Sequence, residues 1–516
     1  MTGESALWRC RCEGRAYLDA MGFTDIFPRC VDFYEGRQWP APTAATRHLP
    51  RPVFNFCDKY VRTKRANILN QPVQLIFSPA AGGRTHLAEI GARVYTDFAA
   101  SLWKSIGQDG LNEDFLTDAA TLGTGILHYF WEDNPDGGTL CGEVLDPLAV
   151  TFGEPQSPDV QRQSYILIAT RADVESVRAL AKREGLPREQ ISLITPDDET
   201  PDTYAASREE RRERKRCTLL TKYYREGGRV FFDRGTRYVT VIRGRSLTPG
   251  LPDAGQGESP PTVSAMQRYP VALMQWRRRK RSIYGIGEIE GMIPAQKALN
   301  WVMGMSVLSV QDTGWPKMIV RPGALRQEIT NTPGEIIEDC SGTGGGISYL
   351  MPPGMPAGAA ALSERLMTLM QDSCGASEVV TGDLDTGNMA ASAIIALQNQ
   401  AKLPIVGVQK RFYRLMEEVG RIWEEFFRCY CTLPQYAAAG AGGEMVFVGS
   451  DFAGVRFSLD VDAGAGSEYS EALGQSTLDR LYDRGDIDLA TYAELCSKNV
   501  MPFREQLRAR LAENEY

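Results

Sequence analysis

Residues 284–312, YGIGEIEGMIPAQKALNWVMGMSVLSVQD, decide the fold around which the rest of the chain is arranged. The apolar residues of this stretch recur at near-helical spacing: Ile289, Met292, Ile293, Leu299, Met303, Val307 and Val310. This pattern predicts a helix over 290–311, which would be about 30 Å long at a rise of 1.5 Å per residue. A helix of that length is long for a core element and is typical of a pillar.

The glycines at the start of this stretch do not identify a dinucleotide site. Gly285, Gly287 and Gly291 have the wrong spacing for a dinucleotide-binding fingerprint, and no strand–helix–Asp context follows them. We therefore set that interpretation aside.

A change of composition follows the predicted helix. Residues 313–354 contain five prolines and many glycines. Their short β candidates lie at 317–320, 335–338 and 347–350. Such a segment between two helices predicts a small module that contains a hairpin.

A second helix and a loop come next. Residues 355–377 place Leu362, Leu366, Leu369 and Ser373 on one stripe among small alanines, which suits close packing against neighbouring helices. Residues 378–393 are punctuated by glycine and contain acidic side chains but no Lys or Arg, which predicts a mobile acidic loop.

The clearest periodicity lies in the predicted helix 389–431. The stripe alternates steps of three and four: Ile405, Val408, Phe412, Leu415, Val419, Ile422 and Phe426. Its modest length favours an ordinary core helix over a coiled coil. Pro404 lacks an N–H and crowds the preceding turn, so we expect a kink there.

The residues before 284 predict an α+β body. Helices are expected at 4–22, in the Pro-bounded segment before Gln71, and at 85–105, 112–122 and 172–185, with strands at 73–77, 123–133, 141–171, 218–225 and 229–242. The basic residues of the second helix, Lys59, Arg62, Lys64 and Arg65, are expected on a solvated or subunit-contact face. The run Arg277 to Arg281 is at least as consistent with a surface anchor or an inter-subunit salt-bridge set as with a DNA contact.

Composition excludes several classes of protein. A formal charge of −8 and a pI near 5.3 argue against a protein that coats nucleic acid electrostatically. The 11 cysteines form no CxxC pair, so neither a zinc site nor a disulfide framework is predicted. The first 15 residues lack the apolar region of a signal peptide, and no apolar run is long enough to predict a membrane helix.

No enzyme motif stands out. The chain has no GxxxxGK[ST], HExxH or GxSxG motif, so it is not predicted to be an ATPase, a zinc protease or a serine hydrolase. Of the three histidines, His128 lies between Leu127 and Tyr129 and is expected to be a satisfied core residue rather than a ligand. We therefore expect no catalytic residue, no metal and no cofactor.

The order of these parts resembles the tailed-bacteriophage portal proteins, the head-to-tail connector rings through which DNA is packaged and ejected. The residues that carry the resemblance are GIGEIEGMIPAQKALNWVMGMSVLSVQ, the Pro/Gly-rich module, the second helix, SEVVTGDLDTGNMAASA and the long Pro-kinked helix. The resemblance covers most of the chain from about residue 50, and the order of the parts gives it most of its specificity.

The resemblance implies a domain layout. The wing would comprise 1–283 and, with the long helix and return strands, 389–467; stem helix 1 would be 284–312, the clip 313–354, stem helix 2 355–377, the tunnel loop 378–393 and a helical crown 468–516. The stem would pack through Met292, Leu299, Met303, Leu362, Leu366 and Leu369. The clip would contact partners through Trp315, Lys317 and Arg321, and the loop would lie nearest DNA through Glu378, Asp383, Asp385, Thr386 and Asn388.

The resemblance also implies partners and a location. A ring, typically of twelve copies, would sit at the capsid vertex of the virion after assembly in the host cytoplasm. Terminase, a head-tail adaptor and the major capsid protein would bind it, and double-stranded DNA would pass through without sequence-specific binding; no membrane is involved. The alternative is another multimeric head or tail protein without a DNA channel.

Overall fold

The structure is a computed structural model of the chain. It describes residues 3–80, 85–134, 138–200, 202–204, 215–256, 265–314, 317–325, 338, 340, 346–350, 357–374, 403–439, 443–452, 454–462, 468–489, 491–492 and 496. The chain folds into two compact units. The larger comprises Met1–Val31, Val61–Glu290 and Thr386–Tyr516, and the smaller comprises Asp32–Tyr60 and Gly291–Asp385.

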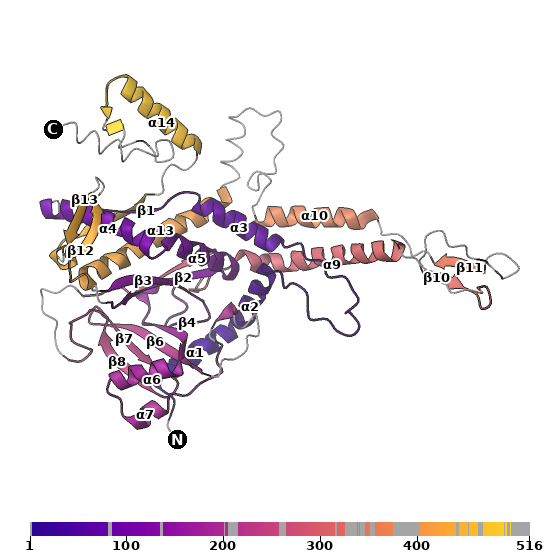
Figure 1. The fold of residues 1–516 in the computed structure, drawn as a ribbon, viewed down its shortest axis with the longest axis horizontal. Coiled ribbons are helices and arrows are strands. Elements are labelled where there is room, and N and C mark those ends of the chain that lie inside the picture. Colours follow the sequence, from indigo (N-terminus) through magenta and orange to yellow (C-terminus); the bar gives the residue numbers. More distant parts are fainter. Residues whose placement is uncertain are drawn as a thin grey trace. The chain divides into compact units, whose positions relative to one another are not determined.

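A five-stranded antiparallel sheet forms one part of the larger unit (Figure 1). Its strands follow one another in chain order: β4 (Val150–Phe152), β5 (Tyr165–Asp173), β6 (Arg216–Glu226), β7 (Arg229–Gly235) and β8 (Thr240–Ser246). Strands that are consecutive in the chain pair directly, and α6 (Val174–Arg183) and α7 (Arg188–Ser192) lie in the connection from β5 to β6.

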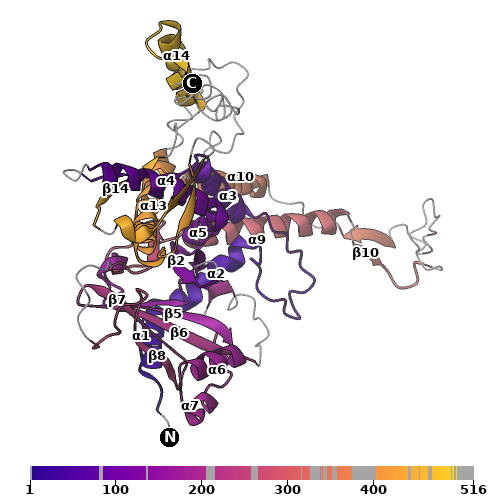
Figure 2. The ribbon, with the colours of Figure 1, turned by 60° about the vertical axis from the view of Figure 1, so that its left-hand side comes forward.

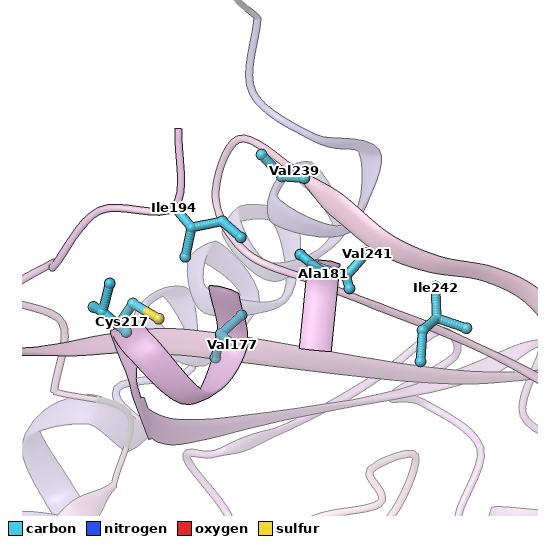
Figure 3. Packing of buried hydrophobic residues seen from close by; sticks show 8 residues of the cluster. Val177, Ala181, Ile194, Cys217, Val239, Val241 and Ile242 are labelled. Atoms are coloured by element: carbon cyan, nitrogen blue, oxygen red, sulfur yellow. The ribbon is translucent and has the colours of Figure 1, made fainter. Parts of the chain in front are cut away.

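Helices cover both faces of this sheet. Cys217 on β6 packs under α6 (Val174–Arg183) with Val177, Ala181 and other apolar side chains (Figure 3). Leu220, three residues along the strand, packs instead with Leu7 and Trp8 of α1 (Ala6–Ala20). Successive strand residues point to opposite faces, so the alternation of apolar residues along β6 places one helix on each face.

A second sheet and its helices complete the larger unit. The three-stranded sheet has the order β3-β2-β9, with β2 (Thr124–Glu132) between β3 (Thr139–Leu145) and β9 (Val271–Gln275). The helices and strands that accompany it include α4 (His86–Ser105), α5 (Gln108–Leu122), α13 (Leu403–Tyr430), the pair β1 (Gln74–Pro79) and β14 (Phe457–Asp462), and the hairpin β12 (Gln435–Ala439) and β13 (Gly443–Phe447). The remaining elements are α7 (Arg188–Ser192), α14 (Glu468–Asp483) and the 3₁₀ turns Val160–Arg162 and Gly449–Phe452.

Helix α13 lies in the core of this unit. All seven residues of the predicted stripe are buried, from Ile405 to Phe426. Aromatic rings surround its C-terminal half, where the ring centroid of Phe427 lies 5.4 Å from that of Tyr95 and 4.8 Å from that of Phe98. The prediction of a core helix is confirmed. Pro404 stands in the first turn, and residues 389–402 lie outside the described residues, so the kink stays a prediction.

The glycines of GIGEIEG allow backbones to approach closely. Gly123, the C-cap of α5, has φ +89°, and a Cβ on it would lie 2.7 Å from the carbonyl carbon of Gly285. A Cβ on Gly287 would lie 2.6 Å from the carbonyl oxygen of Thr121. Side chains at these positions would push the segment before α9 away from α5, because real Cβ atoms do not pack this closely to backbone.

The smaller unit contains two long helices and a hairpin (Figure 1, Figure 2). Helix α9 (Glu288–Gly314) begins at the end of the larger unit and continues through the smaller one. Strands β10 (Lys317–Val320) and β11 (Ile347–Leu350) pair antiparallel beyond its C-terminal end, and α10 (Ala357–Cys374) follows. Helices α2 (Phe23–Tyr34) and α3 (Phe56–Leu69) run across the boundaries between the units.

The α+β class predicted from the sequence is confirmed, with specific differences. Helix α2 was not predicted; it contains Pro28. Strand β12 was also missed. The predicted solvated or subunit-contact face of α3 is wrong for Lys64, which is buried within the chain. It is only in part right for Arg65, whose guanidinium donates a 2.7 Å hydrogen bond to Thr117 Oγ1. Among the described residues, no helix combines the length and the apolar composition that crossing a membrane requires.

Candidate functional site

A buried ion pair holds the N-terminal end of α9. Lys64 Nζ lies 2.9 Å from Glu288 Oε1, and the two side chains are 8% and 11% exposed. Trp276 Nε1 donates to the same oxygen at 2.7 Å. An acidic residue in the first turn of a helix also interacts favourably with the helix dipole. The first turn of α9 is therefore fixed to α3 and to the end of β9.

The basic run 277–281 forms the turn before α9 and is named the basic turn. Arg277 Nη2 donates to the carbonyl of Gly287 at 2.7 Å, and Arg279 Nη2 lies 3.2 Å from Glu290 Oε2. Arg278, Lys280 and Arg281 are exposed and form no ion pair among the residues that the structure describes. The run therefore uses two cations to hold α9 and presents three to solvent.

A buried amide network fixes α9 within the smaller unit. Gln296 Nε2 donates to the carbonyl of Phe54 at 2.8 Å and to Asn300 Oδ1 at 2.9 Å. Asn300 Nδ2 in turn donates to Gln38 Oε1 at 2.7 Å. All three amide side chains are buried, and a satisfied polar network of this kind defines one register for the helix.

Beyond this network several apolar side chains of α9 are exposed to solvent. Met305 is 56% exposed and Val310 is 71% exposed, and Trp301 and Val307 are exposed as well. On α10, Leu369 is 51% exposed and Leu362 is also exposed. Exposed apolar residues that recur along two helices of one unit mark a surface for association, whereas single exposed apolar residues need no explanation.

One small apolar pocket lies between α9 and the segment that contains Trp39 and Pro50. Trp39 and Trp301 meet edge to face with ring centroids 5.3 Å apart, and Gly304, Met305 and Pro50 complete much of the lining. The pocket volume is about 80 Å³, which suits one or two methyl-sized groups. The pocket is therefore too small for a cofactor.

The predicted stem-packing residues differ in burial and fall into three groups. Met292 and Leu299 are buried, and Met303 and Leu366 are half-buried. Leu362 and Leu369 are exposed. In the described part of one chain, the predicted packing residues are thus buried near the start of α9 and half-buried or exposed on α10.

The predicted partner-contact and loop residues fall mostly outside the described structure. Arg321 is exposed, and its backbone N–H bonds the carbonyl of Gly346 at 2.9 Å beside the hairpin. Trp315 and the side chain of Lys317 lie outside the described residues. So do all five loop residues: Glu378, Asp383, Asp385, Thr386 and Asn388. The exposed apolar residues of the hairpin, Ile319, Val320 and Tyr349, were not predicted.

Carboxylates of α13 hold the segment that leads into β9. Glu425 Oε2 accepts hydrogen bonds from the backbone N–H groups of Gln267 and Arg268, both at 2.9 Å. Arg268 Nη1 donates to Glu418 Oε1 at 2.8 Å. Burial raises the pKa of Glu425, although these donors favour its charged form. The contacts join the core helix to the strand that precedes the basic turn.

Two buried carboxyl groups hold the short segment 202–204. Tyr204 donates a 2.6 Å hydrogen bond to Asp118 on α5, and Asp146 accepts from the backbone N–H and the hydroxyl of Thr203 at 2.9 and 2.7 Å. Burial, with the nearby charge of Asp146, raises the pKa of Asp118 to about 8. Burial raises the pKa of Asp146 to about 6. No sequence motif marks these residues.

His128 is a satisfied core residue, as predicted. Its Nδ1 lies 2.8 Å from Glu143 Oε1 and its Nε2 lies 3.0 Å from the hydroxyl of Tyr223. The ring thereby connects the three-stranded sheet to β6. Among the described residues, no three His, Cys, Asp or Glu side chains are placed to hold a metal ion.

Comparison with known proteins gives one informative match. Residues 254–438 match the family model of phage P22-like portal proteins. The matched region includes the basic turn, α9, the hairpin, α10 and α13. No curated protein shows a significant match to the chain.

Two solved structures were also similar over most of the chain. One is described as "Virion of native gene transfer agent (GTA) particle", with 12% identity, a TM-score of 0.35, and coverage of 85% of this chain and 89% of that one. The other is described as "Neck of empty GTA particle computed with C6 symmetry", with 11% identity, a TM-score of 0.37 and the same coverage. Over residues 254–438, which hold elements that carried the resemblance in the sequence, the chain is similar to phage P22-like portal proteins.

Proposed function

We propose that copies of this chain assemble into a closed ring at the capsid vertex that serves as the conduit for genome packaging and ejection. One observation supports this proposal most strongly: α9 and α10 carry apolar side chains that the chain leaves exposed, Met305, Val310 and Leu369 in particular. Together with the portal-family match over 254–438, these exposed side chains are consistent with a wall built from neighbouring copies.

In such a ring, each of the other predicted segments would have a function. Residues 378–393 would line the bore of the ring. Each contact between a lysine and a DNA phosphate adds salt-dependent binding of the DNA, and acidic and small polar side chains avoid this binding. The module at 313–354 would meet terminase and a head-tail adaptor, and the wing would meet the major capsid protein. Such a protein needs no catalytic residue, because a separate terminase would supply the energy of packaging.

Electron microscopy of the purified chain tests the proposal directly. We expect closed rings, predicted to contain twelve copies, with a central hole wide enough for duplex DNA. A matched variant, Met305→Ser with Val310→Ser, should give markedly fewer rings, while Leu87→Ser with Ile90→Ser, two exposed apolar positions of α4, should leave the rings intact.

Two results would contradict the proposal. A wild-type chain that remains monomeric at all tested concentrations would contradict the proposed ring. A multimer without an axial hole would favour the alternative, a head or tail connector that binds only proteins. Crosslinking of DNA-filled particles addresses the loop separately: adducts at Thr386 or Asn388 are expected, and their absence would remove the loop from the DNA path.

A further inference from the structure

The apolar pocket between Trp39 and Trp301, named the tryptophan pocket, has walls that one chain holds in place. Trp39 Nε1 donates to the carbonyl of Pro52 at 2.9 Å, which fixes this indole. A Cβ on Gly304 would lie 3.2 Å from the carbonyl oxygen of Pro50, so the glycine lets α9 and the segment before α3 approach closely. The pocket is therefore formed before any partner binds.

Amide side chains close the loop that forms one wall of the pocket. Gln38 Nε2 donates to Asn55 Oδ1 at 3.0 Å, so the two ends of the 38–55 loop are bonded to each other. Asn300 of α9 donates to Gln38 Oε1 at 2.7 Å and bonds the loop to the helix. A surface that is already ordered loses less conformational entropy when it binds a partner. The loop and α9 thus present a preorganised surface.

The tryptophan pocket opens onto exposed apolar side chains. Trp301 is 50% exposed and Met305 is 56% exposed, and both line the pocket. The volume of about 80 Å³ suits the methyl groups of one aliphatic side chain. An apolar pocket that continues into an exposed apolar surface is typical of a site that receives a side chain from another protein.

Two arginines of the 38–55 loop give the pocket a positively charged border. Arg51 lines the pocket, and its guanidinium donates to the carbonyl of Pro40 at 2.8 Å and to Thr46 Oγ1 at 3.2 Å. Arg47 is exposed and directly follows Thr46, which also lines the pocket. Neither arginine forms an ion pair with a carboxylate in the described part of the chain. Because guanidinium groups pair well with carboxylates, the pocket suits an aliphatic side chain with acidic neighbours.

The sequence contains one segment with this chemistry in its most compact form. The triplet Asp-Leu-Asp occurs once in the chain, at 383–385, within the stretch 378–393 that contains no Lys or Arg. A leucine from this triplet that enters the pocket would bring an aspartate on each side of it to the border. The triplet therefore matches the pocket in size, in apolar character and in charge.

We propose that Leu384 of one copy inserts into the tryptophan pocket of a second copy. Asp383 and Asp385 would then lie opposite the two arginines of the border. A second copy is favoured because the pocket is continuous with the apolar side chains that the proposed ring would cover. A contact between two different patches of one molecule is heterologous and can propagate around a ring. The inference rests on the proposed ring and names one contact between its neighbours.

Disulfide trapping on the full chain tests the contact. Met305→Cys with Leu384→Cys places one thiol at the pocket and one on the triplet. Mild oxidation of the assembled protein should give covalent chains of several copies on a non-reducing gel. Mass spectrometry of the linked peptides distinguishes this bond from any that the 11 native cysteines form. Neither single variant should give the same linked peptides.

Substitution of Leu384 gives a second, independent measurement. Leu384→Ser should raise the subunit concentration for half-assembly, measured by mass photometry, about tenfold or more, because a central apolar anchor is lost. Leu384→Met conserves the volume and should stay within about twofold of wild type. Val379→Ser, which removes an apolar side chain of the same stretch outside the triplet, should also stay within about twofold. Circular dichroism must show native folding for each variant.

A charge exchange tests the border of the pocket. Arg47→Glu places two like charges near the triplet and should also raise the half-assembly concentration. Arg47→Glu with Asp383→Arg makes the charges complementary again and should recover assembly. A combined variant that assembles no better than Arg47→Glu alone would overturn the predicted pairing.

The outcomes separate the contact from the ring. A wild-type ring without the intermolecular disulfide, or normal assembly of Leu384→Ser, overturns the contact and leaves the ring in place. A disulfide confined to single chains overturns the second copy as the source of the leucine. A wild-type chain that forms no ring contradicts both the contact and the proposed function.

Discussion

Helices α13 and α9 have nearly the same length, 28 and 27 residues, yet the burial of their apolar residues differs. Every residue of the α13 stripe is buried in one chain. The apolar residues of α9 are buried at Met292 and Leu299 and exposed to solvent at Met305 and Val310. An apolar stripe thus indicates burial but does not say whether the covering surface belongs to the same chain.

The difference separates two kinds of stability. Side chains of α13 contribute to the folding of one subunit, because their neighbours come from that subunit. In the proposed ring, side chains in the second half of α9 would contribute through assembly, because several of them are exposed in the folded chain. The effect of a substitution on the unfolding of the subunit should therefore decrease from the first region to the second.

The largest effect is expected from Phe427→Ala in α13. Phe427 is fully buried against the rings of Tyr95 and Phe98, and truncation of a buried phenylalanine costs about 3–5 kcal/mol. Urea denaturation of the dissociated subunit should show this loss in the free energy of unfolding. A loss below about 1 kcal/mol would contradict the core role of α13.

A slightly smaller effect is expected from Lys64→Met at the start of α9. The substitution leaves Glu288 buried with only the Trp276 donor, and removal of one partner of a buried ion pair costs about 3 kcal/mol. Lys64→Met with Glu288→Gln should recover most of the loss, because the amide oxygen still accepts from Trp276. Thermal unfolding of both variants measures the difference; equal losses would mean that the ion pair does not anchor the helix.

The change in unfolding free energy with pH should come from a buried carboxyl group of α5, Asp118, rather than from α9. Burial raises the pKa of Asp118 to about 8, whereas an aspartate in the unfolded chain titrates near 3.9. Between these values the folded chain keeps a proton that the unfolded chain has lost, so the stability falls as pH rises from about 4 to about 8.

Asp118→Asn should remove most of this dependence. The amide keeps an acceptor for Tyr204 and cannot ionise, so the variant should gain stability relative to wild type at pH 8 more than at pH 5. Chemical denaturation at both pH values measures the gain. An identical pH profile for the variant and the wild type would show that Asp118 does not carry the extra proton.

The smallest effect on the subunit is expected from Met305→Ser. Its side chain is largely exposed, so the free energy of unfolding of the dissociated subunit should change by less than about 0.5 kcal/mol. Denaturation of the dissociated subunit checks this value. A loss as large as that of Phe427→Ala would show that Met305 is covered within one chain and would remove the contrast between the helices.

Sequence reasoning predicted the elements whose signal is local. The stripe of α13 and the β10 and β11 strands follow from periodicity and from the placement of Pro and Gly, which act within a few residues. The burial of Lys64 was not predictable, because its partner Glu288 is 224 residues away. Asp118 and Tyr204 are 86 residues apart, and nothing in either neighbourhood marks them as a pair.

The stripe predicted for α9 includes Val307 and Val310, but their exposure was not predicted, and Met305 lies outside that stripe. Periodicity gives the face of a helix on which apolar residues lie and does not reveal what covers that face. For the basic run 277–281, the sequence left open a surface anchor, an inter-subunit salt-bridge set and a DNA contact. In the structure Arg277 and Arg279 bond to residues at the start of α9.

Oxidative footprinting of Met305 tests the central claim most directly. Hydroxyl radicals would be applied to the assembled and the dissociated protein, and oxidation would be read by mass spectrometry, with buried Met416 as the control for folding. We expect Met305 to be oxidised readily in the dissociated subunit and to be strongly protected in the assembled protein. Equal oxidation of Met305 in both forms would contradict the claim that neighbouring copies cover the exposed apolar side chains of α9.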